Sequence, residues 1–234
     1  MSSVQYPGTE LDVFAHARNW KAYLRELMSP WLRGHVLEVG AGIGGTTSAF
    51  RDNAQESWTA LEPDGSLAER LRARVFDARL PVDVRVGSLA SLPENRRFDC
   101  ILYIDVLEHI EDDAGELRLA GQRLAPSGAI VVLSPAHQAL YSPFDAAIGH
   151  HRRYSRRQLT AITPETLRLV HTQYIDTVGL LLSAGNRLVL KSAAPSLAQV
   201  VFWDRRCIPL SRRLDRLLGG RVGKSVLAVW RTPA

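Results

Sequence analysis

A glycine-rich turn between a buried strand and a helix constrains the fold of this chain more than any other feature. Residues 36–47 begin with an apolar run and continue with four glycines within the six positions 40–45. This pattern is typical of a buried parallel strand that ends in a tight turn before a helix. Glycine allows the backbone to approach a ligand closely, and the N-terminus of the following helix favours an anionic group. The turn therefore predicts a nucleotide-like ligand.

The spacing of these glycines fits two different motifs. Gly40, Gly42 and Gly45 match G-x-G-x-x-G, the fingerprint of dinucleotide-binding proteins. Gly40, Gly42 and Gly44 match G-x-G-x-G equally well. The glycine turn alone does not separate the two interpretations, so the neighbouring segments must decide between them.

Three neighbouring features distinguish the two motifs. Glu38 stands two residues before the first glycine, and Glu62 ends a second apolar strand at residues 58–61. Residues 98–110 form a strand that runs into an acidic loop and carry the segment V-L-E-H-I. Together these features resemble the class I S-adenosylmethionine-dependent methyltransferases, in particular their small-molecule branch. The resemblance extends from about Asn19 to the C-terminus.

The resemblance implies a set of cofactor contacts. Glu38 and the glycine turn would hold the methionine end of S-adenosylmethionine, Glu62 the ribose, and Ser88 with Leu89 the adenine. Many relatives place Asp where Ser88 stands, and Ser offers a hydrogen bond without a charge. The cofactor-binding positions implied in this way are Glu38, Gly40, Ala41, Gly42, Gly44, Glu62, Ser88, Leu89 and Asp105.

The order of apolar segments predicts an α/β fold with a doubly wound, mostly parallel seven-stranded sheet of the Rossmann-like type. The expected strands are residues 36–39, 58–62, 82–87, 98–104, 129–133, 167–175 and 225–230. The family resemblance implies that the last strand is antiparallel and that a helical insertion precedes it. In open α/β sheets the ligand lies outside the carboxyl ends of the strands, and the candidate cofactor residues fall at those ends.

We expect one methyltransferase domain over residues 1–234. Its parts are a helical N-terminal lid (1–34), a cofactor-binding core (35–135), an acceptor loop and helix (136–163) and a helical insertion (179–223). Residues 1–10 are expected to form a loose arm, and helical spacing predicts a helix over residues 11–31. This helix either covers the cofactor pocket or only packs on the sheet.

The most individual segment is residues 141–154, which is too rich in Pro, Gly and charge for a core element. It resembles the F-D-x-x-x-G-H-x-R-R-Y loop of one bacterial methyltransferase subgroup. Such a loop beside the pocket would cover or form the acceptor site. Alternatively, Asp145 pairs with Arg152 or Arg153 and only fixes the loop.

Methyl transfer from a sulfonium requires alignment of the acceptor, and a hydroxyl or acidic carbon also requires a base. Histidine is the usual base near neutral pH. His109 follows the fourth strand, whereas His150 and His151 lie on the loop, where Tyr154 could orient the acceptor. The sequence does not choose among these four catalytic candidates.

Charge and cysteine content indicate which binding partners and which cellular compartment to expect. The net charge of +5 suits nucleic acid, but no basic tract with interleaved aromatic residues occurs, so nucleic acid is not expected. The sequence has two cysteines, Cys100 and Cys207, which are far apart, and no secretory signal or membrane span is evident, so we expect a cytoplasmic protein. No metal-ligand spacing occurs, so we expect no metal. The insertion is expected to pack against its own domain or a second subunit; contact with an anionic membrane or lipid-like substrate is the alternative.

These observations favour an enzyme that transfers a methyl group from S-adenosylmethionine to the oxygen, nitrogen or carbon of a small molecule and releases S-adenosylhomocysteine. Natural-product and lipid-linked intermediates are both candidate acceptors for this monomer or homodimer. One alternative is an NAD(P)-dependent oxidoreductase, which the chain supports poorly because it lacks a Tyr-x-x-x-Lys pair. The other is a non-catalytic module that binds S-adenosylmethionine and regulates a partner.

Overall fold

The side chains of strand β4 (Phe98–Ile104) show how the layers of the molecule are built in the computed structural model. Cys100 and Leu102 point into one apolar cluster, whereas Ile101 and Tyr103 point into a second cluster on the other face of the sheet. A strand that is apolar on both faces must be covered on both faces. The structure describes residues 5–8, 10–76, 81–185 and 195–233.

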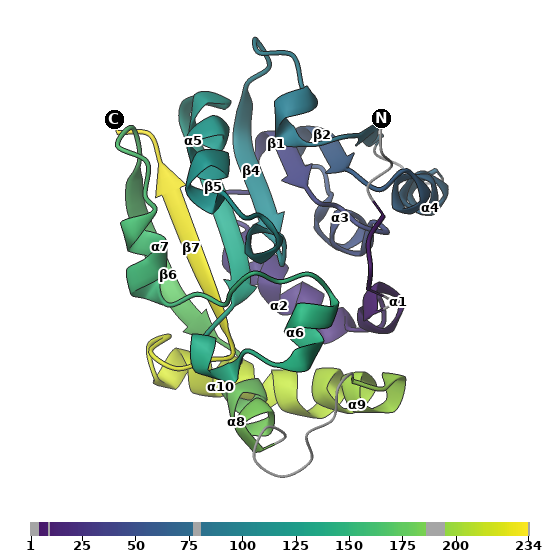
Figure 1. Cartoon of the computed structure of the whole chain (residues 1–234), viewed down its shortest axis with the longest axis vertical. Coiled ribbons are helices and arrows are strands. Elements are labelled where there is room, and N and C mark those ends of the chain that lie inside the picture. Colours follow the sequence, from purple (N-terminus) through teal and green to yellow (C-terminus); the bar gives the residue numbers. More distant parts are fainter. Residues whose placement is uncertain (1–4, 9, 77–80, 186–194, 234) are drawn as a thin grey trace.

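Seven strands form one mixed sheet in the order β3-β2-β1-β4-β5-β7-β6 (Figure 1). The first five strands pair in parallel, and β7 pairs antiparallel with both of its neighbours. This arrangement confirms the predicted fold class. Besides β4, the strands are β1 (Gly34–Val39), β2 (Gln55–Glu62), β3 (Asp83–Val86), β5 (Leu124–Pro135), β6 (Arg168–Ile175) and β7 (Ser225–Arg231).

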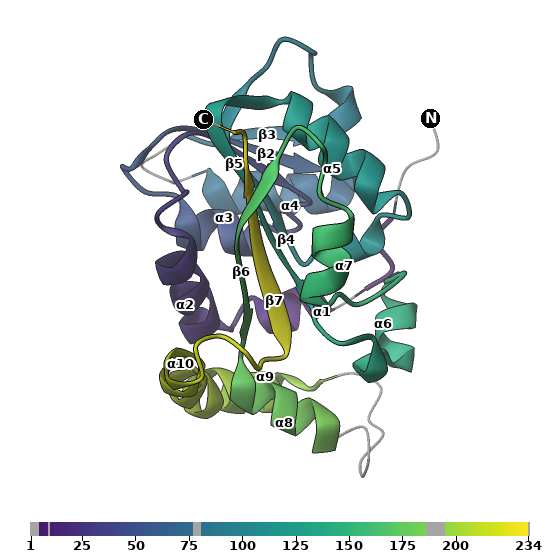
Figure 2. The ribbon, with the colours of Figure 1, turned by 90° about the vertical axis from the view of Figure 1, so that its left-hand side faces the viewer.

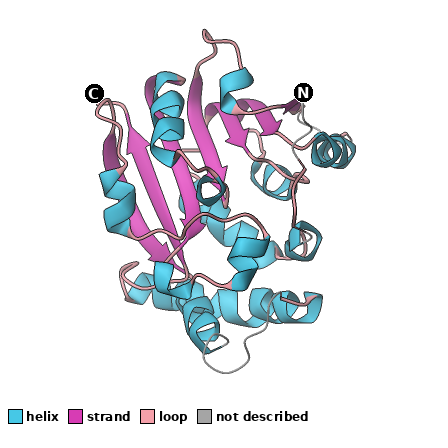
Figure 3. Cartoon of the chain, in the orientation of Figure 1, coloured by secondary structure: helices cyan, strands magenta, loops and turns pink. Residues whose placement is uncertain are grey.

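Helices cover both faces of this sheet (Figures 2 and 3). On one face, helices α2, α3, α4 and α10 contribute Leu24, Phe50, Leu71 and Ile208 to the first apolar cluster. On the other face, α5 and α7 contribute to the second cluster. The helices are α1 (Glu10–Phe14), α2 (Arg18–Met28), α3 (Gly45–Phe50), α4 (Gly65–Val75), α5 (Asp113–Gln122), α6 (Pro143–Ala147), α7 (Arg156–Ala161), α8 (Thr177–Gly185), α9 (Leu197–Phe202) and α10 (Ile208–Leu217).

The single helix predicted over residues 11–31 is wrong, because the chain breaks between α1 and α2. The Lys21 ammonium group donates hydrogen bonds to the carbonyl groups of Phe14 and Ala15, which close the first helix. The Asp204 carboxylate accepts from the backbone N–H groups of Asn19 and Trp20, which begin the second. Groups distant in sequence therefore satisfy both helix ends at the break.

The fifth strand is longer than predicted. The predicted strand covers residues 129–133, whereas β5 begins at Leu124 and includes residues 125–128 as an irregularity. Leu124 pairs with Phe98 and Ala129 pairs with Cys100, so the residues between them bulge out of the ladder. The described part of the insertion is helical, as predicted. None of the described helices is long and apolar enough to span a bilayer.

Candidate functional site

The glycine turn follows β1 at the carboxyl end of the sheet, where the backbone must approach β4 closely. Gly40 has a φ of +68°, and a Cβ atom at this position would lie 2.6 Å from Cγ2 of Val106. Gly42 has a φ of +55°, and its N–H donates a hydrogen bond of 2.7 Å to Oε2 of Glu62. Both conformations favour glycine over residues with a side chain, and together they hold the turn against Glu62.

Two buried carboxyl groups flank this turn in different ways. Glu62 accepts hydrogen bonds from the N–H groups of Gly42 and Asp64, and burial raises its pKa. Glu38 lies beneath the turn, where its Oε2 accepts from Oγ1 of Thr47 at 2.6 Å and from Nε1 of Trp58 at 3.0 Å. Glu38 therefore ties β1 to α3 and β2. Burial raises the Glu38 pKa to about 7.

The remaining cofactor candidates occupy the ends of β1, β3 and β4. Ala41 is buried, and its N–H donates to the carbonyl oxygen of Leu61. Ser88 is exposed, whereas the Leu89 side chain is fully buried and belongs to the apolar core. Asp105 is exposed and adopts a φ of +55°, and partial desolvation by the surrounding protein raises its pKa to about 6. Positive φ at a residue other than glycine is uncommon and concentrates at functional sites.

The loop over residues 141–154 is fixed by Asp145, whose side chain is buried. Nε and Nη2 of Arg153 donate to the two carboxylate oxygens at 2.9 Å, a bidentate pair. The N–H and hydroxyl of Ser142 also donate to Asp145. Burial opposes ionisation of this carboxyl, but the hydrogen bonds from His150 and Arg153 lower its pKa well below the usual range. Arg152 pairs instead with Asp113, at 2.6 Å.

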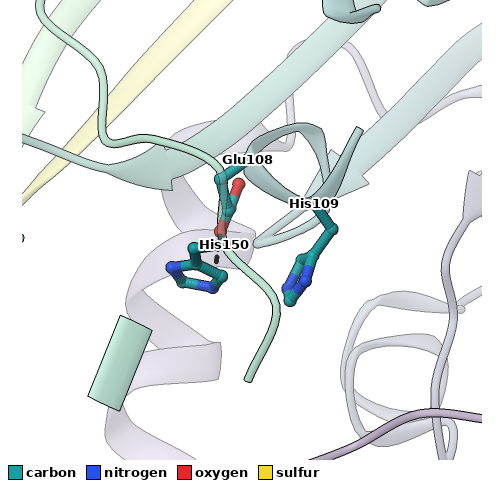
Figure 4. Close-up of side chains that lie close together, drawn as sticks. All are labelled: Glu108, His109 and His150. Atoms are coloured by element: carbon teal, nitrogen blue, oxygen red, sulfur yellow. Dashed lines mark ion pairs between the residues drawn. The ribbon is translucent and has the colours of Figure 1, made fainter. Parts of the chain in front are cut away.

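Asp145 also orients His150. Oδ1 of Asp145 lies 3.1 Å from Nδ1 of His150. An ionised carboxylate only accepts hydrogen bonds, so Nδ1 must carry the hydrogen, and Nε2 of the neutral ring then carries the lone pair. That nitrogen lies 3.8 Å from Oε1 of Glu108 (Figure 4). The lone pair is therefore directed toward a buried acid at the carboxyl end of β4.

His109 packs beside His150, with its ring perpendicular and the ring centres 4.5 Å apart. Burial, together with the neighbouring His150, lowers the pKa of His109 to about 4. The carboxyl oxygens of Glu108 are buried and form no hydrogen bond with the described residues. Burial raises the pKa of Glu108 well above its usual range, and the negative charge of Asp105 adds to this. The cluster therefore favours neutral forms of His109 and Glu108.

The two other predicted catalytic residues are placed differently. His151 is exposed, and its backbone N–H donates to the carbonyl oxygen of Glu108. Tyr154 is buried, and its hydroxyl donates a 2.6 Å hydrogen bond to Asp113. This contact supports a structural role for Tyr154. The site thus brings His109 and His150 together with Glu108, while His151 and Tyr154 point elsewhere.

The model of a family described as "Methyltransferase domain" matches residues 14–166. The chain belongs to this family. The recognition of a class I S-adenosylmethionine-dependent methyltransferase from the sequence is thereby confirmed.

Relatives of this methyltransferase include norajmaline N-methyltransferase of Rauvolfia serpentina, 30% identical over 109 residues (45% of this chain and 37% of that protein). A ubiquinone biosynthesis O-methyltransferase of Paramagnetospirillum magneticum is 31% identical over 102 residues (44% and 41%). The fold is similar to that of coclaurine N-methyltransferase bound to N-methylheliamine and SAH, with a TM-score of 0.60, 14% identity and coverage of 91% and 72%. The matches to the first two relatives span about two fifths of their length.

The methyltransferase also has site residues that the sequence interpretation missed. The backbone N–H of Tyr6 donates to Oδ2 of Asp64, and the Tyr6 ring packs edge-on against His109. Pro7 lies near Gly149 of the loop. The described part of the expected loose arm is therefore anchored across the site. Asp64 could have been found as a helix N-cap after Pro63, whereas nothing in the arm predicts the contact of Tyr6.

One grouping in this methyltransferase has ligand chemistry suited to a metal ion. Glu108, His109 and His150 each offer an atom within 4.8 Å of the others' atoms. The sequence contains no metal-ligand spacing, because folding alone brings these residues together from two separate segments. Two of these groups, Glu108 and His150, also form the close acid–base contact described above.

Proposed function

We propose that this chain transfers the methyl group of S-adenosylmethionine to a small-molecule acceptor, with His150 as the general base. One observation carries the proposal: Asp145 holds Nδ1 of His150, which leaves Nε2 as the lone-pair nitrogen, 3.8 Å from Glu108. Glu108 follows β4, which pairs with β1, the strand that leads into the glycine turn. A base held in one tautomer beside a nucleotide-type turn is the arrangement that methyl transfer to a protonated acceptor requires.

The residues present fit the cofactor. The Glu62 carboxylate has about four lone-pair sites and uses two of them for the N–H groups of Gly42 and Asp64, so it retains acceptors for ribose hydroxyls. Gly40 and Gly44 keep the turn free of side chains, and Ala41 adds only a methyl group. Leu89 offers adenine its backbone, because its side chain is buried in the core. Ser88 offers a hydroxyl group.

Two carboxyl groups have narrower roles in this proposal. Glu38 supports the methionine end indirectly, since its Oε2 already binds Thr47 and Trp58. Asp105 contributes an exposed carboxyl group just after β4, next to the glycine turn. We assign both residues to shaping the donor side of the site.

When bound, the cofactor supplies an electrophilic methyl group on a sulfonium. The chain then aligns the acceptor, and such positioning can contribute about 7–11 kcal/mol at best. Nε2 of His150 removes the proton from the acceptor, and Asp145 stabilises the imidazolium that forms. Arg153 keeps the Asp145 carboxylate ionised and in place for this step.

His150 suits the role of base better than His109. A general base works best when its pKa lies near the working pH, and burial lowers the pKa of His109 to about 4. The His109 ring instead packs against the rings of both His150 and Tyr6. We assign residues 1–34 to a lid and residues 136–163 to the acceptor side, and the contact of Tyr6 with His109 supports this division.

The acceptor is a natural-product or lipid-linked small molecule, methylated on oxygen, nitrogen or carbon. We propose a cytoplasmic location, supported by two buried free thiols, Cys100 and Cys207. No nucleic acid partner is proposed. The family match does not favour the two alternatives, the oxidoreductase and the regulatory module.

The experiment that tests the proposed function is release of S-adenosylhomocysteine across a panel of hydroxyl, amine and carbon acceptors. The proposal expects turnover with at least one acceptor class in the presence of a chelator. Dependence of turnover on added Zn²⁺ would instead assign Glu108, His109 and His150 to a metal site, because imidazole and carboxylate ligands suit that ion. Binding of the cofactor without turnover on any acceptor would favour the regulatory module.

A further inference from the structure

The insertion contains one long helical segment that runs from α9 through the π-helical residues Trp203–Cys207 into α10. One side of this segment is held against the rest of the domain by hydrogen bonds. Asp204 accepts from the first N–H groups of α2. Asp215 accepts from the hydroxyl of Tyr23 and from the N–H of Asp176. Both acidic side chains of the segment therefore point inward.

The opposite side of the same segment combines arginine with large apolar residues. Arg206, Leu210, Arg213 and Leu217 follow one another at helical spacing and are all exposed. Leu217 is 81% exposed and Phe202, on the same segment, is 58% exposed. A helix that only packed on its own domain would not present these leucines and this phenylalanine to solvent.

The exposed apolar residues are concentrated in this part of the chain. Of the large hydrophobic residues that are exposed in the described chain, most belong to the insertion: Leu181, Leu182, Leu197, Phe202, Leu210, Leu217, Leu218 and Val222. Helix α8 lies against α10, where the Val178 N–H donates to Oγ of Ser211. Figures 1 and 2 place α8, α9 and α10 together at one end of the molecule.

The exposed charged residues of the described segment 195–223 are all positive. The described residues 195–223 contain two acids, Asp204 and Asp215, and both are buried and hydrogen-bonded. Their six cationic residues are Arg205, Arg206, Arg212, Arg213, Arg216 and Arg221. Of these, Arg212 and Arg216 pair with Glu26. The exposed surface of the insertion is therefore both apolar and positively charged.

We propose that this end of the molecule binds peripherally to an anionic phospholipid membrane. A helix lying in the interfacial plane uses apolar residues to enter the headgroup region and arginines to contact acidic lipids. A second copy of the chain fits this surface poorly, because the two arginine-rich faces would repel each other. Nucleic acid would engage the arginines and leave Phe202, Leu210 and Leu217 in water.

Membrane binding is independent of the proposed methyl transfer, but it affects where the site lies. The carboxyl ends of β4 and β5 point toward the end of the molecule that carries the insertion (Figure 1). Helix α1 also contacts the insertion, since Phe14 packs edge-on against Trp203. The membrane-binding surface thus places the candidate site beside the lipid.

The test is co-sedimentation of the full chain with phosphatidylcholine vesicles, with and without phosphatidylglycerol. Binding is expected only with phosphatidylglycerol. It should weaken as salt rises from about 0.1 M to about 1 M, because the Debye length falls from about 10 Å to about 3 Å. Two double variants separate the contributions: Arg206→Glu/Arg213→Glu for charge and Phe202→Ser/Leu217→Ser for apolar contact. Each should lower vesicle partitioning about tenfold or more.

Arg157→Glu/Arg168→Glu is the matched control, because it makes the same charge change at exposed positions outside the insertion. Thermal melting verifies that all variants fold, and the control should bind vesicles as the unmodified chain does. Absence of binding by the unmodified chain, or equal loss in the control and in Arg206→Glu/Arg213→Glu, would overturn the proposal. Self-association that Phe202→Ser/Leu217→Ser abolishes, without any vesicle binding, would also overturn it and assign the surface to a second copy.

Discussion

Oδ1 of Asp145 lies 3.1 Å from Nδ1 of His150, and this contact fixes which nitrogen of the ring can accept a proton. The carboxylate is itself held by a bidentate pair with Arg153. The two interpretations of residues 141–154 that the sequence leaves open, a fixed loop and a functional loop, are therefore compatible. The residue that fixes the loop also orients the candidate base.

Replacing His150 with Ala should lower turnover by a factor of about 10²–10⁴, because this removes the general base. Affinity for S-adenosylhomocysteine, measured by calorimetry, should stay unchanged, since His150 belongs to the acceptor side. His151→Ala is the matched control: its side chain is exposed, and the backbone hydrogen bond to Glu108 is retained. Normal turnover of His150→Ala together with an inactive His109→Ala would move the base to His109.

Replacing Tyr154 with Phe tests the structural role of its hydroxyl. The change removes the 2.6 Å hydrogen bond to Asp113 and should lower the free energy of unfolding by about 1.5–3 kcal/mol, as for other hydrogen bonds to charged groups. Denaturant unfolding measures the loss, and turnover should be unchanged. Lost turnover with unaltered stability would instead return Tyr154 to the acceptor contacts predicted from the sequence.

The raised pKa of Glu38 predicts a pH dependence of stability. Its pKa is 4.5 in the unfolded chain and about 7 when folded, so between these values the folded protein binds a proton that the unfolded chain releases. The resulting stabilisation is complete below pH 4.5 and is lost as pH rises through 7. At about 1.4 kcal/mol per pKa unit it amounts to at most about 3.5 kcal/mol.

Glu38→Gln should lack this dependence, because its amide does not titrate. The measurement is denaturant unfolding of both proteins across this pH range, and the difference between them isolates Glu38. A comparison is needed because His109, whose pKa burial lowers to about 4, changes stability in the opposite direction. Parallel profiles for the two proteins would show that Glu38 does not titrate in this window.

The strands and the glycine turn could be predicted from the sequence because their signals are local. Continuous apolar runs such as residues 98–104 identify buried parallel strands. The turn after the first strand is identified by its glycine residues. Ser155 is a residue type favoured at helix N-termini, and its side chain caps α7. In each case a short window of sequence contains the physical cause.

The parts that sequence did not predict depend on contacts between distant segments. The break between α1 and α2 depends on Asp204, which lies far along the chain in the insertion. The choice of Arg153 over Arg152 as the partner of Asp145 depends on Asp113, which takes the other arginine. No periodicity within one segment carries this information.

Glu62→Gln should weaken cofactor binding about tenfold or more, since an ionised acceptor of ribose hydroxyls becomes neutral. Calorimetric titration with S-adenosylhomocysteine measures the effect. Glu69→Gln makes the same change at an exposed position of the neighbouring helix α4 and should bind normally. Equal affinities in the two variants would remove Glu62 from the ribose contacts.

The most direct test of the central claim is titration of the unmodified chain with S-adenosylhomocysteine and, separately, with NAD and NADP. The account predicts that S-adenosylhomocysteine binds at one site per chain and raises the melting temperature. A ligand at about 100 times its dissociation constant stabilises the folded state by about 2.7 kcal/mol. NAD and NADP should leave the melting temperature unchanged. Stabilisation by NAD or NADP without any by S-adenosylhomocysteine would contradict the account.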